Sequence, residues 1–451
     1  MRIIEGAEEA RRTVLRRQPL GETPVPIAVR QKTREMFGAE LSPAEAVARI
    51  LADVRTEGDA AVLRYSEAFD GVSYPSLVVA KEEMKAAYEQ VEPKIAAALR
   101  FAAERIRLFH EMQLERTMSS FSVGGLGQQV RPLEKVGLYA AGTVAVYPSS
   151  VLMTAIPARV AGVAEICMIT PAGSDGRVSP LKLVAADIAG ITKVYRGSGA
   201  QAVAAFAFGT ESIPRVDKIC GPGNLFVTLA KQQVYGWVGV DAIYGPTETI
   251  VVADDSADPA LCAADLLAQA EHDELATPIL ITPSLEVARA VAREIERQLA
   301  DLERAAIARS SLETRGGAVV AKDMEEAITL ANEFVPEHLC LAVRDAAAWA
   351  EKVRNAGGLF VGESSPEAMG DFTAGPSHVM PTAGSARFSS PLNVLDFLKI
   401  TNVVAVGEDA LREWGPAAAA IARVEGLTAH ARAIEMRLRD KGLGDKDTSL
   451  G

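Results

Sequence analysis

Apolar residues recur at helical spacing over much of residues 1–127. Ser42 and Pro43 form a typical helix start, and apolar positions follow them at intervals of four residues. A second stretch, residues 81–115, carries a single apolar stripe, and Pro93 inside it predicts a bend. The N-terminal region is therefore expected to be helical.

The middle of the chain alternates between short β-rich runs and helical runs, which is typical of βαβ units with parallel sheets. Two consecutive sets of strands are predicted. They cover residues 136–140, 166–170, 193–195 and 218–220, and then 249–252, 279–282, 318–320 and 339–343. Residues 370–384 have the composition of a loop, after which the chain returns to helix. The pattern indicates the α/β class.

Composition and charge narrow the classes of function. The 451 residues correspond to about three domains of roughly 150 residues, and 49% apolar with 24% charged residues is ordinary for a globular protein. The net charge of −12 argues against a nucleic-acid partner. An apolar stretch of about 18 residues is missing and Arg2 and Glu5 are charged, so neither a membrane span nor a secretory signal is predicted. We expect a cytoplasmic protein.

The cysteines are single and lie among apolar neighbours, with no CxxC spacing, at positions 167, 220, 262 and 340. They are interpreted as small core residues, with a catalytic thiol as the alternative.

Four polar residues from three segments form a candidate metal site. Gln269 and His272 are three apart, so on a helix they would share one face. Asp371 lies in a glycine- and proline-rich loop, and His430 follows near the end. Together they supply nitrogen and oxygen ligands of the kind that zinc accepts. The alternative for each residue is an ordinary polar position.

Glu337 and His338 are adjacent, immediately before an apolar run, with Pro336 constraining the backbone. A neighbouring carboxylate and imidazole give two proton-transfer groups of different basicity, which suits two successive proton removals near neutral pH. The alternative is a solvated strand end.

Two glycine-containing turns are weak candidates for cofactor binding. Residues 221–224 (Gly-Pro-Gly-Asn) lie between a predicted strand and a predicted helix, where backbone amides can hold a phosphate. Residues 197–201 have the same standing, and a structural tight turn explains both equally well. These residues alone leave a metal-dependent hydrolase and a metal-assisted dehydrogenase equally supported.

The motifs in order are similar to those of the histidinol dehydrogenase family. The similarity covers nearly the whole chain and rests on Gly199-Ala200-Gln201-Ala202, Gly221-Pro222-Gly223-Asn224, Gly245-Pro246-Thr247-Glu248, Gln269-Ala270-Glu271-His272, Pro336-Glu337-His338-Leu339, His378-Val379-Met380-Pro381-Thr382 and Leu427-Thr428-Ala429-His430. It implies an NAD-dependent zinc enzyme that oxidises L-histidinol through the aldehyde to L-histidine in histidine biosynthesis.

The resemblance also implies a role for each site residue. The zinc ligands would be Gln269, His272, Asp371 and His430, and the proton-handling pair would be Glu337 and His338. Besides these residues, the substrate would contact Thr247, His378 and Glu425. NAD would contact Tyr139, Gln201 and Asn224. The family is a homodimer in which the C-terminal segment completes the partner's site.

The fold implied is two consecutive incomplete Rossmann-like α/β domains with helical extensions at both ends. The expected segments are residues 1–127 (helical), 128–246 (cofactor side), 247–384 (zinc and proton-handling pair) and 385–451 (helical, completing the partner's site).

The chain departs from the family pattern after Tyr139, where Ala140-Ala141-Gly142 replaces the usual Pro-Gly-Gly, at Ser377 in place of asparagine, and at Thr247 in place of serine. A related zinc- and NAD-dependent dehydrogenase of another hydroxymethyl substrate therefore remains an alternative. A metal-dependent hydrolase and a catalytically silent binding protein are the other two.

Overall fold

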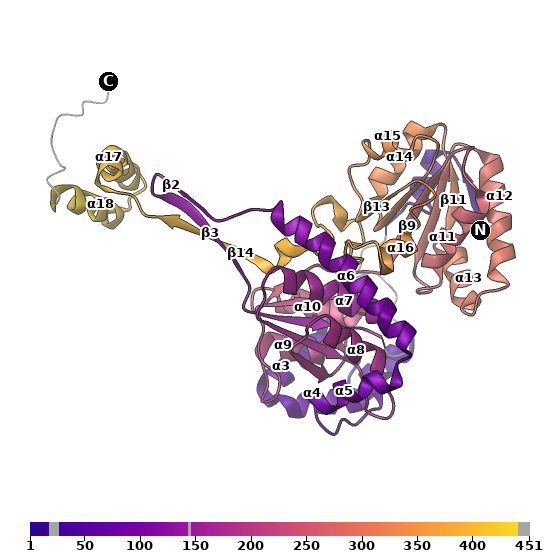
Figure 1. Cartoon of the computed structure of the whole chain (residues 1–451), viewed down its shortest axis with the longest axis horizontal. Helices are drawn as coiled ribbons and strands as arrows, with labels where there is room; N and C mark the ends of the chain where they lie inside the picture. Colours follow the sequence, from indigo (N-terminus) through magenta and orange to yellow (C-terminus); the bar gives the residue numbers. More distant parts are fainter. Residues whose placement is uncertain (18–26, 143–145, 441–451) are drawn as a thin grey trace. The chain divides into compact units, whose positions relative to one another are not determined.

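The computed structural model describes residues 1–17, 27–142 and 146–440 (Figure 1). The chain divides into two compact units. The first contains Met1–Glu115 and Leu133–Phe397, and the second contains Arg116–Pro132 and Leu398–Gly451.

One parallel sheet of the first unit has the strand order β6-β5-β4-β7-β8 among the described residues. Its strands are β4 (Lys135–Tyr139), β5 (Glu165–Thr170), β6 (Lys193–Arg196), β7 (Lys218–Cys220) and β8 (Gly239–Val240). They alternate with α7 (Pro148–Val160), α8 (Pro180–Ile188), α9 (Gly199–Phe208) and α10 (Leu225–Val234). The strands β4 and β5 are almost wholly buried, as expected for a parallel sheet covered on both faces.

The second parallel sheet has the order β1-β11-β10-β9-β12-β13 in the described part of the chain. Its strands are β1 (Ile3–Glu5), β9 (Glu248–Ala253), β10 (Thr277–Thr282), β11 (Gly317–Val320), β12 (His338–Ala342) and β13 (Gly358–Val361). Alternate residues of β9 enter two cores. Val251 and Ala253 pack with α11 (Pro259–Ala270), α12 (Leu285–Leu299) and α13 (Ala305–Thr314), whereas Ile250 and Val252 pack with α1 (Ala7–Arg12), α14 (Met324–Phe334) and α15 (Ala346–Ala350).

The remaining described helices of this unit lie between β1 and β4 along the chain or after β13. They are α2 (Ile27–Phe37), α3 (Pro43–Glu57), α4 (Asp59–Asp70), α5 (Lys81–Ala87), α6 (Pro93–Glu115), α16 (Glu367–Phe372) and the short 3-10 turns η2 (Tyr88–Gln90), η3 (Ser385–Arg387) and η4 (Val394–Phe397). Helix α3 begins with the predicted cap, because Ser42 and Glu45 form a capping box.

The α/β class and both sets of strands are confirmed, and two local expectations are wrong. Pro93 does not bend one long helix: it begins α6, where a missing N–H costs nothing, after a break that follows α5 and η2. The N-terminal region is not helical throughout, because β1 pairs with β11, some 315 positions later (Ile3 with Ala318).

The second unit contains β2 (Phe121–Val123), β3 (Leu126–Pro132), β14 (Leu398–Val404), α17 (Glu408–Val424) and α18 (Thr428–Asp440). Strand β14 pairs antiparallel with β3, and α17 and α18 pack against each other (Figure 1). The segment expected to be helical after residue 384 therefore contains a strand as well. Within the described residues, no helix combines the length and the apolar character needed to cross a membrane.

Candidate active site

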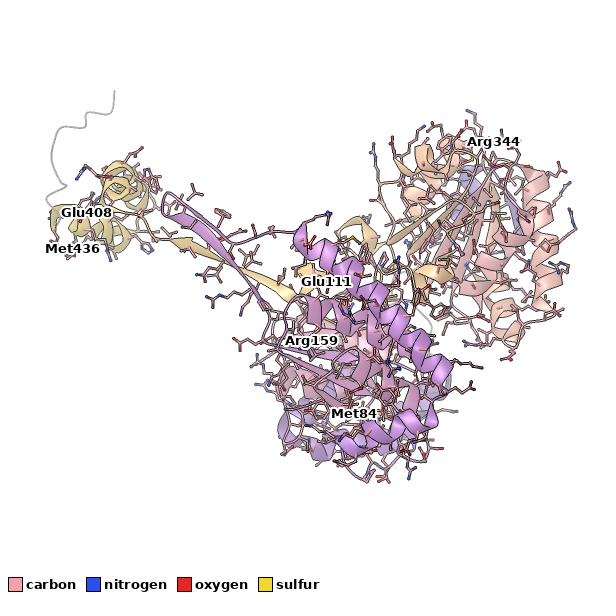
Figure 2. All side chains as sticks on the ribbon, viewed as in Figure 1. Met84, Glu111, Arg159, Arg344, Glu408 and Met436 are labelled. Carbon is pink, nitrogen blue, oxygen red and sulfur yellow. The ribbon has the colours of Figure 1, made fainter. Side chains whose placement is uncertain are left out.

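The proton-handling pair, Glu337 and His338, lies at the amino end of β12. Helix α14 ends at Phe334, Val335 adopts a left-handed conformation with φ 59°, and β12 begins at His338. His338 is in register with Thr249 near the start of β9. The other end of β12 leads to Arg344, which is labelled in Figure 2. The pair thus occupies the edge of the second sheet where its strands begin.

Glu337 is buried, and its two hydrogen bonds to described residues both use Oε2. Thr247 Oγ1 lies 2.7 Å away, and the backbone N–H of Glu248 donates at 3.2 Å. Burial raises the pKa of Glu337 to about 7, although His338 and these two donors favour the carboxylate. The side chain can therefore exchange a proton near neutral pH.

His338 is held through Nδ1, which donates to the backbone carbonyl of Glu248 at 3.2 Å. Its ring stacks on Phe360 with 5.9 Å between ring centroids. The buried Nε2 has no hydrogen-bond partner among the described residues, and Asp371 Oδ1 lies 3.6 Å from it. Burial lowers the pKa of His338, but Glu337, Asp371 and Glu367 outweigh it and raise the pKa to about 10. The ring nitrogen left for chemistry is therefore Nε2.

Gln269 lies in the last turn of α11 and is buried. Its Oε1 is 2.8 Å from Thr247 Oγ1, and its Nε2 has no partner in the described structure. The single hydroxyl hydrogen of Thr247 thus faces two acceptors, Gln269 Oε1 and Glu337 Oε2. Rotating the amide by 180° lets Nε2 donate to Thr247, which then donates to Glu337, and frees the amide oxygen. A free buried oxygen at this position fits a metal ligand.

Gln269 and His272 do not lie on one helix, contrary to expectation. Helix α11 ends at Ala270, so His272 lies in the turn beyond it, where its N–H donates to Gln269 O at 3.1 Å. His272 is exposed. Partial burial of the ring lowers its pKa, while the nearby carboxylate of Asp371 acts in the opposite direction. His272 and Asp371 are therefore electrostatic neighbours.

Asp371 is on helix α16 and not in a loop as expected, although the loop that follows it folds back. His378 Nδ1 donates to the Asp371 carbonyl at 2.7 Å, and Ser150 Oγ donates to His378 Nε2 at 3.0 Å. Burial raises the pKa of Asp371, but His338 outweighs it and keeps the pKa below its ordinary value. The carboxylate is thus negative and ready to bind a cation. Both ring nitrogens of His378 already have partners.

Glu425 and His430 belong to the second unit, where both are exposed on the α17–α18 hairpin. Across the described residues, no group of three or more His, Cys, Asp and Glu side chains is arranged to hold a metal ion. A complete set would thus need the amide of Gln269 beside His272 and Asp371, together with one further ligand.

The three residues expected to contact NAD line one cavity of about 380 Å³. Tyr139 ends β4, Gln201 lies in the first turn of α9, and Asn224 caps α10 by accepting from two backbone amides. Gly221 must be glycine, because a Cβ there would lie 2.3 Å from Tyr139 O. The predicted strand–turn–helix is confirmed, and the cavity size is typical of small-molecule sites of about 300–1,000 Å³.

Sequence reasoning missed two residues, Glu248 and Glu367, that border the site of Glu337 and His338. Glu248 is the first residue of the buried strand β9 and its only charged one, and a charge at the start of a mostly apolar run was a signal in the sequence. Glu367 is fully buried, accepts from Thr249 Oγ1 at 2.9 Å, and has its pKa raised to about 7 by burial. Nothing in the local sequence distinguishes Glu367 from a surface acid.

Comparisons with known proteins point to one family. The model of the family Histidinol dehydrogenase matches residues 34–438. Histidinol dehydrogenase of Deinococcus radiodurans is 50% identical over 442 residues, which is 97% of this chain and 100% of the relative. The histidinol dehydrogenase of Geobacter metallireducens is 49% identical over 403 residues, covering 88% and 92% of the two chains. The crystal structure of histidinol dehydrogenase from Elizabethkingia anophelis superposes with a TM-score of 0.88 at 31% identity, covering 98% of this chain and 99% of that one.

Proposed function

The chain belongs to the histidinol dehydrogenase family, and from that premise we propose that it catalyses the zinc-requiring, NAD-dependent, four-electron oxidation of L-histidinol to L-histidine. The observation that carries the proposal is the 3.6 Å separation of His338 Nε2 and Asp371 Oδ1. It places the open nitrogen of a base beside a candidate metal ligand.

The metal would be held by Gln269, His272 and Asp371 of one chain and by His430 of a second copy. The partnerless amide group of Gln269 and the negative charge of Asp371 support this set. Zinc bound there would supply a template for the amino alcohol and, by neutralising Asp371, would favour the unprotonated form of His338. Glu425 would accompany His430 across the interface of a homodimer.

His338 acts in the first oxidation. Its Nε2 accepts the carbinol proton as a hydride leaves the same carbon, which yields the aldehyde. The bond from Nδ1 to Glu248 O fixes the tautomer of the unprotonated ring, so that Nε2 carries the free lone pair in that form. NAD in the cavity lined by Tyr139, Gln201 and Asn224 would supply the hydride acceptor for both oxidations.

Glu337 acts before the second oxidation. Thr247 and the Glu248 N–H hold Oε2, which leaves Oε1 to take a proton from the water that adds to the aldehyde. His338 then accepts a proton from the hydrate as the second hydride leaves, and the product is the carboxylic acid. Each positioned base can contribute about 10² to 10⁴ in rate.

Thr247 and His378 would border the substrate. The hydroxyl of Thr247 already joins Gln269 to Glu337, so that it links the candidate metal site with the base. His378 would reach substrate only after giving up its bond from Ser150, and in this structure it holds the Asp371 backbone.

The test is the yield of NADH per molecule of substrate. Zinc-loaded protein with excess NAD should form two NADH for each L-histidinol consumed, and prior chelation should abolish the reaction. A panel of other hydroxymethyl compounds should react far more slowly. Preference for a different member of the panel, or hydrolysis without NAD, would contradict the proposal.

A further inference from the structure

We infer that Arg17 is a positioning residue for the proton-handling pair, acting through the backbone turn at Val335 and through Glu248. This inference rests on the proposed function for its kinetic readout. Arg17 lies in the N-terminal segment, about 320 positions before the pair along the chain, and nothing in the local sequence marks it.

The side chain of Arg17 binds backbone carbonyls at the C-terminal end of helix α14. Its Nε donates to Phe334 O at 2.8 Å, and Nη2 donates to Val335 O at 2.8 Å. The guanidinium also lies 4.0 Å from the centroid of the Phe334 ring. Carbonyls at a helix C-terminus lack partners within the helix, so Arg17 supplies donors that the turn needs.

The turn that Arg17 holds is strained. Val335 has φ 59° and ψ 63°, a left-handed conformation that is unfavourable for a β-branched residue. It also precedes Pro336, which disfavours helical backbone in its predecessor. Without external donors the turn would relax, and Glu337 and His338, two and three residues later, would move with it.

The same guanidinium fixes Glu248, the second support of the pair. Both carboxylate oxygens of the buried Glu248 accept from Arg17, in a bidentate ion pair whose arginine is partly exposed. The backbone N–H of Glu248 donates to Glu337 Oε2, and its carbonyl accepts from His338 Nδ1. One arginine therefore anchors both pieces of backbone that orient the pair.

Arg11 provides a matched control on the same two elements. It joins the N-terminal segment to α14 through a bidentate ion pair with Glu333, at 2.7 and 3.0 Å, but this pair is exposed. Among the residues that the structure describes, the Arg11 side chain donates to Glu333 and not to Glu248 or to the carbonyls of the turn. A substitution of Arg11 therefore removes an ion pair to α14 but leaves the hydrogen bonds from Arg17 to the turn in place.

The experiment compares zinc-loaded Arg17→Gln, Arg17→Lys, Arg11→Gln and Arg17→Gln/Val335→Gly. For Arg17→Gln we expect kcat with L-histidinol to fall about 10- to 100-fold, with KM for NAD changed less than about twofold, because a small misplacement of reacting groups lowers the rate of chemistry. Arg17→Lys keeps the charge beside Glu248 but cannot donate to both carbonyls. Its kcat should therefore lie between those of the wild type and Arg17→Gln. Arg11→Gln should match wild type within about twofold.

Glycine adopts the left-handed conformation without strain. The kcat of Arg17→Gln/Val335→Gly should therefore be at least about fivefold higher than that of Arg17→Gln. Hydrogen exchange gives a readout independent of activity. The amides of Gly357 and Gly358, which donate to Pro336 O and Glu337 O, should lose protection in Arg17→Gln and regain it in the double variant.

Unchanged kcat in Arg17→Gln, or equal losses in Arg17→Gln and Arg11→Gln, would overturn the inference. So would a glycine variant that rescues neither kcat nor protection. A wild-type protein that fails to oxidise L-histidinol would refute the proposed function, and the exchange data would still decide whether Arg17 holds the turn.

Discussion

His338 Nε2 and Asp371 Oδ1 lie 3.6 Å apart, although His338 begins β12 and Asp371 lies on α16. The negative carboxylate contributes to the raised pKa of His338. In a protein whose Asp371 binds a metal ion, the same carboxylate would be neutralised. Metal binding and the basicity of His338 are thus coupled by direct proximity.

This coupling predicts the behaviour of Asp371→Asn. The amide keeps the size of the side chain but removes the charge, so zinc affinity should fall at least about 100-fold and dehydrogenase activity with it. Metal content after dialysis against a weak chelator is the measurement. The exposed acid Glu351, changed to Gln, is the control and should keep its zinc. Full zinc occupancy in Asp371→Asn would remove Asp371 from the ligand set.

Glu337→Gln should separate the two oxidations. The amide keeps the bond to Thr247 but cannot accept a proton from water, so oxidation of supplied histidinaldehyde should fall about 10²- to 10⁴-fold while formation of the first NADH falls much less. Single-turnover rates with alcohol and with aldehyde are the measurement, and the alcohol step is the internal control. Equal losses in both steps would mean that Glu337 does not have a separate task.

The raised pKa of Glu337 predicts the pH dependence of the aldehyde step. The carboxylate form is the base, and it predominates above the pKa of about 7. The contribution of Glu337 to the rate of aldehyde oxidation should therefore rise about tenfold per pH unit below 7 and level off above it. Glu337→Gln should lose this rise. A rate independent of pH between 5 and 8 in the wild type would contradict the assignment.

The sequence predicted local elements better than long-range pairings. Strand β7 was predicted at residues 218–220 because its own residues carry the pattern. Strand β1 has only three residues and exists through its pairing with β11, and β14 depends in the same way on β3, so local periodicity could not reveal them. Adjacent Glu337 and His338 were recognisable from their chemistry.

The supports of the site were less accessible to sequence reasoning. The link from Gln269 through Thr247 to Glu337 joins residues that are 22 and 90 positions apart. Arg17 lies still further along the chain from the carbonyls it binds. Hydrogen bonds of this kind follow from the packing of whole elements, which one sequence does not contain.

If His430 and Glu425 complete the site of a second copy, two inactive variants should restore activity together. A mixed dimer of His338→Ala and His430→Ala would contain one site with both defects and one with neither, so it should have about half of wild-type activity. Subunit exchange is verified by mass spectrometry before the assay. Each variant alone should stay inactive, and an inactive mixed dimer would indicate sites built within one chain.

Lys182 on α8 is buried to 1% exposure beneath the segment that follows Tyr139. Its Nζ donates to Thr170 Oγ1 and to Gly142 O, both at 2.8 Å. In the part of the chain that the structure describes, no carboxylate forms an ion pair with it. Burial lowers the pKa of Lys182 to about 8.

This depressed pKa predicts that Lys182 makes folding stability depend on alkaline pH. Between pH 8 and about 10.5 the folded chain has lost the proton of Lys182, whereas the unfolded chain still binds it, so the free energy of unfolding should rise with pH in this window, by about 3 kcal/mol at most. Below pH 8 both states are protonated, and the contribution of Lys182 to the free energy of unfolding does not change with pH.

Urea unfolding of the wild type and of Lys182→Met at pH 7.5, 9 and 10 isolates the effect, because other groups titrate equally in both proteins. The free energy of the wild type should increase relative to the variant across the series. A constant difference between the two proteins would show that the proton on Lys182 is held equally well in the folded and unfolded chains.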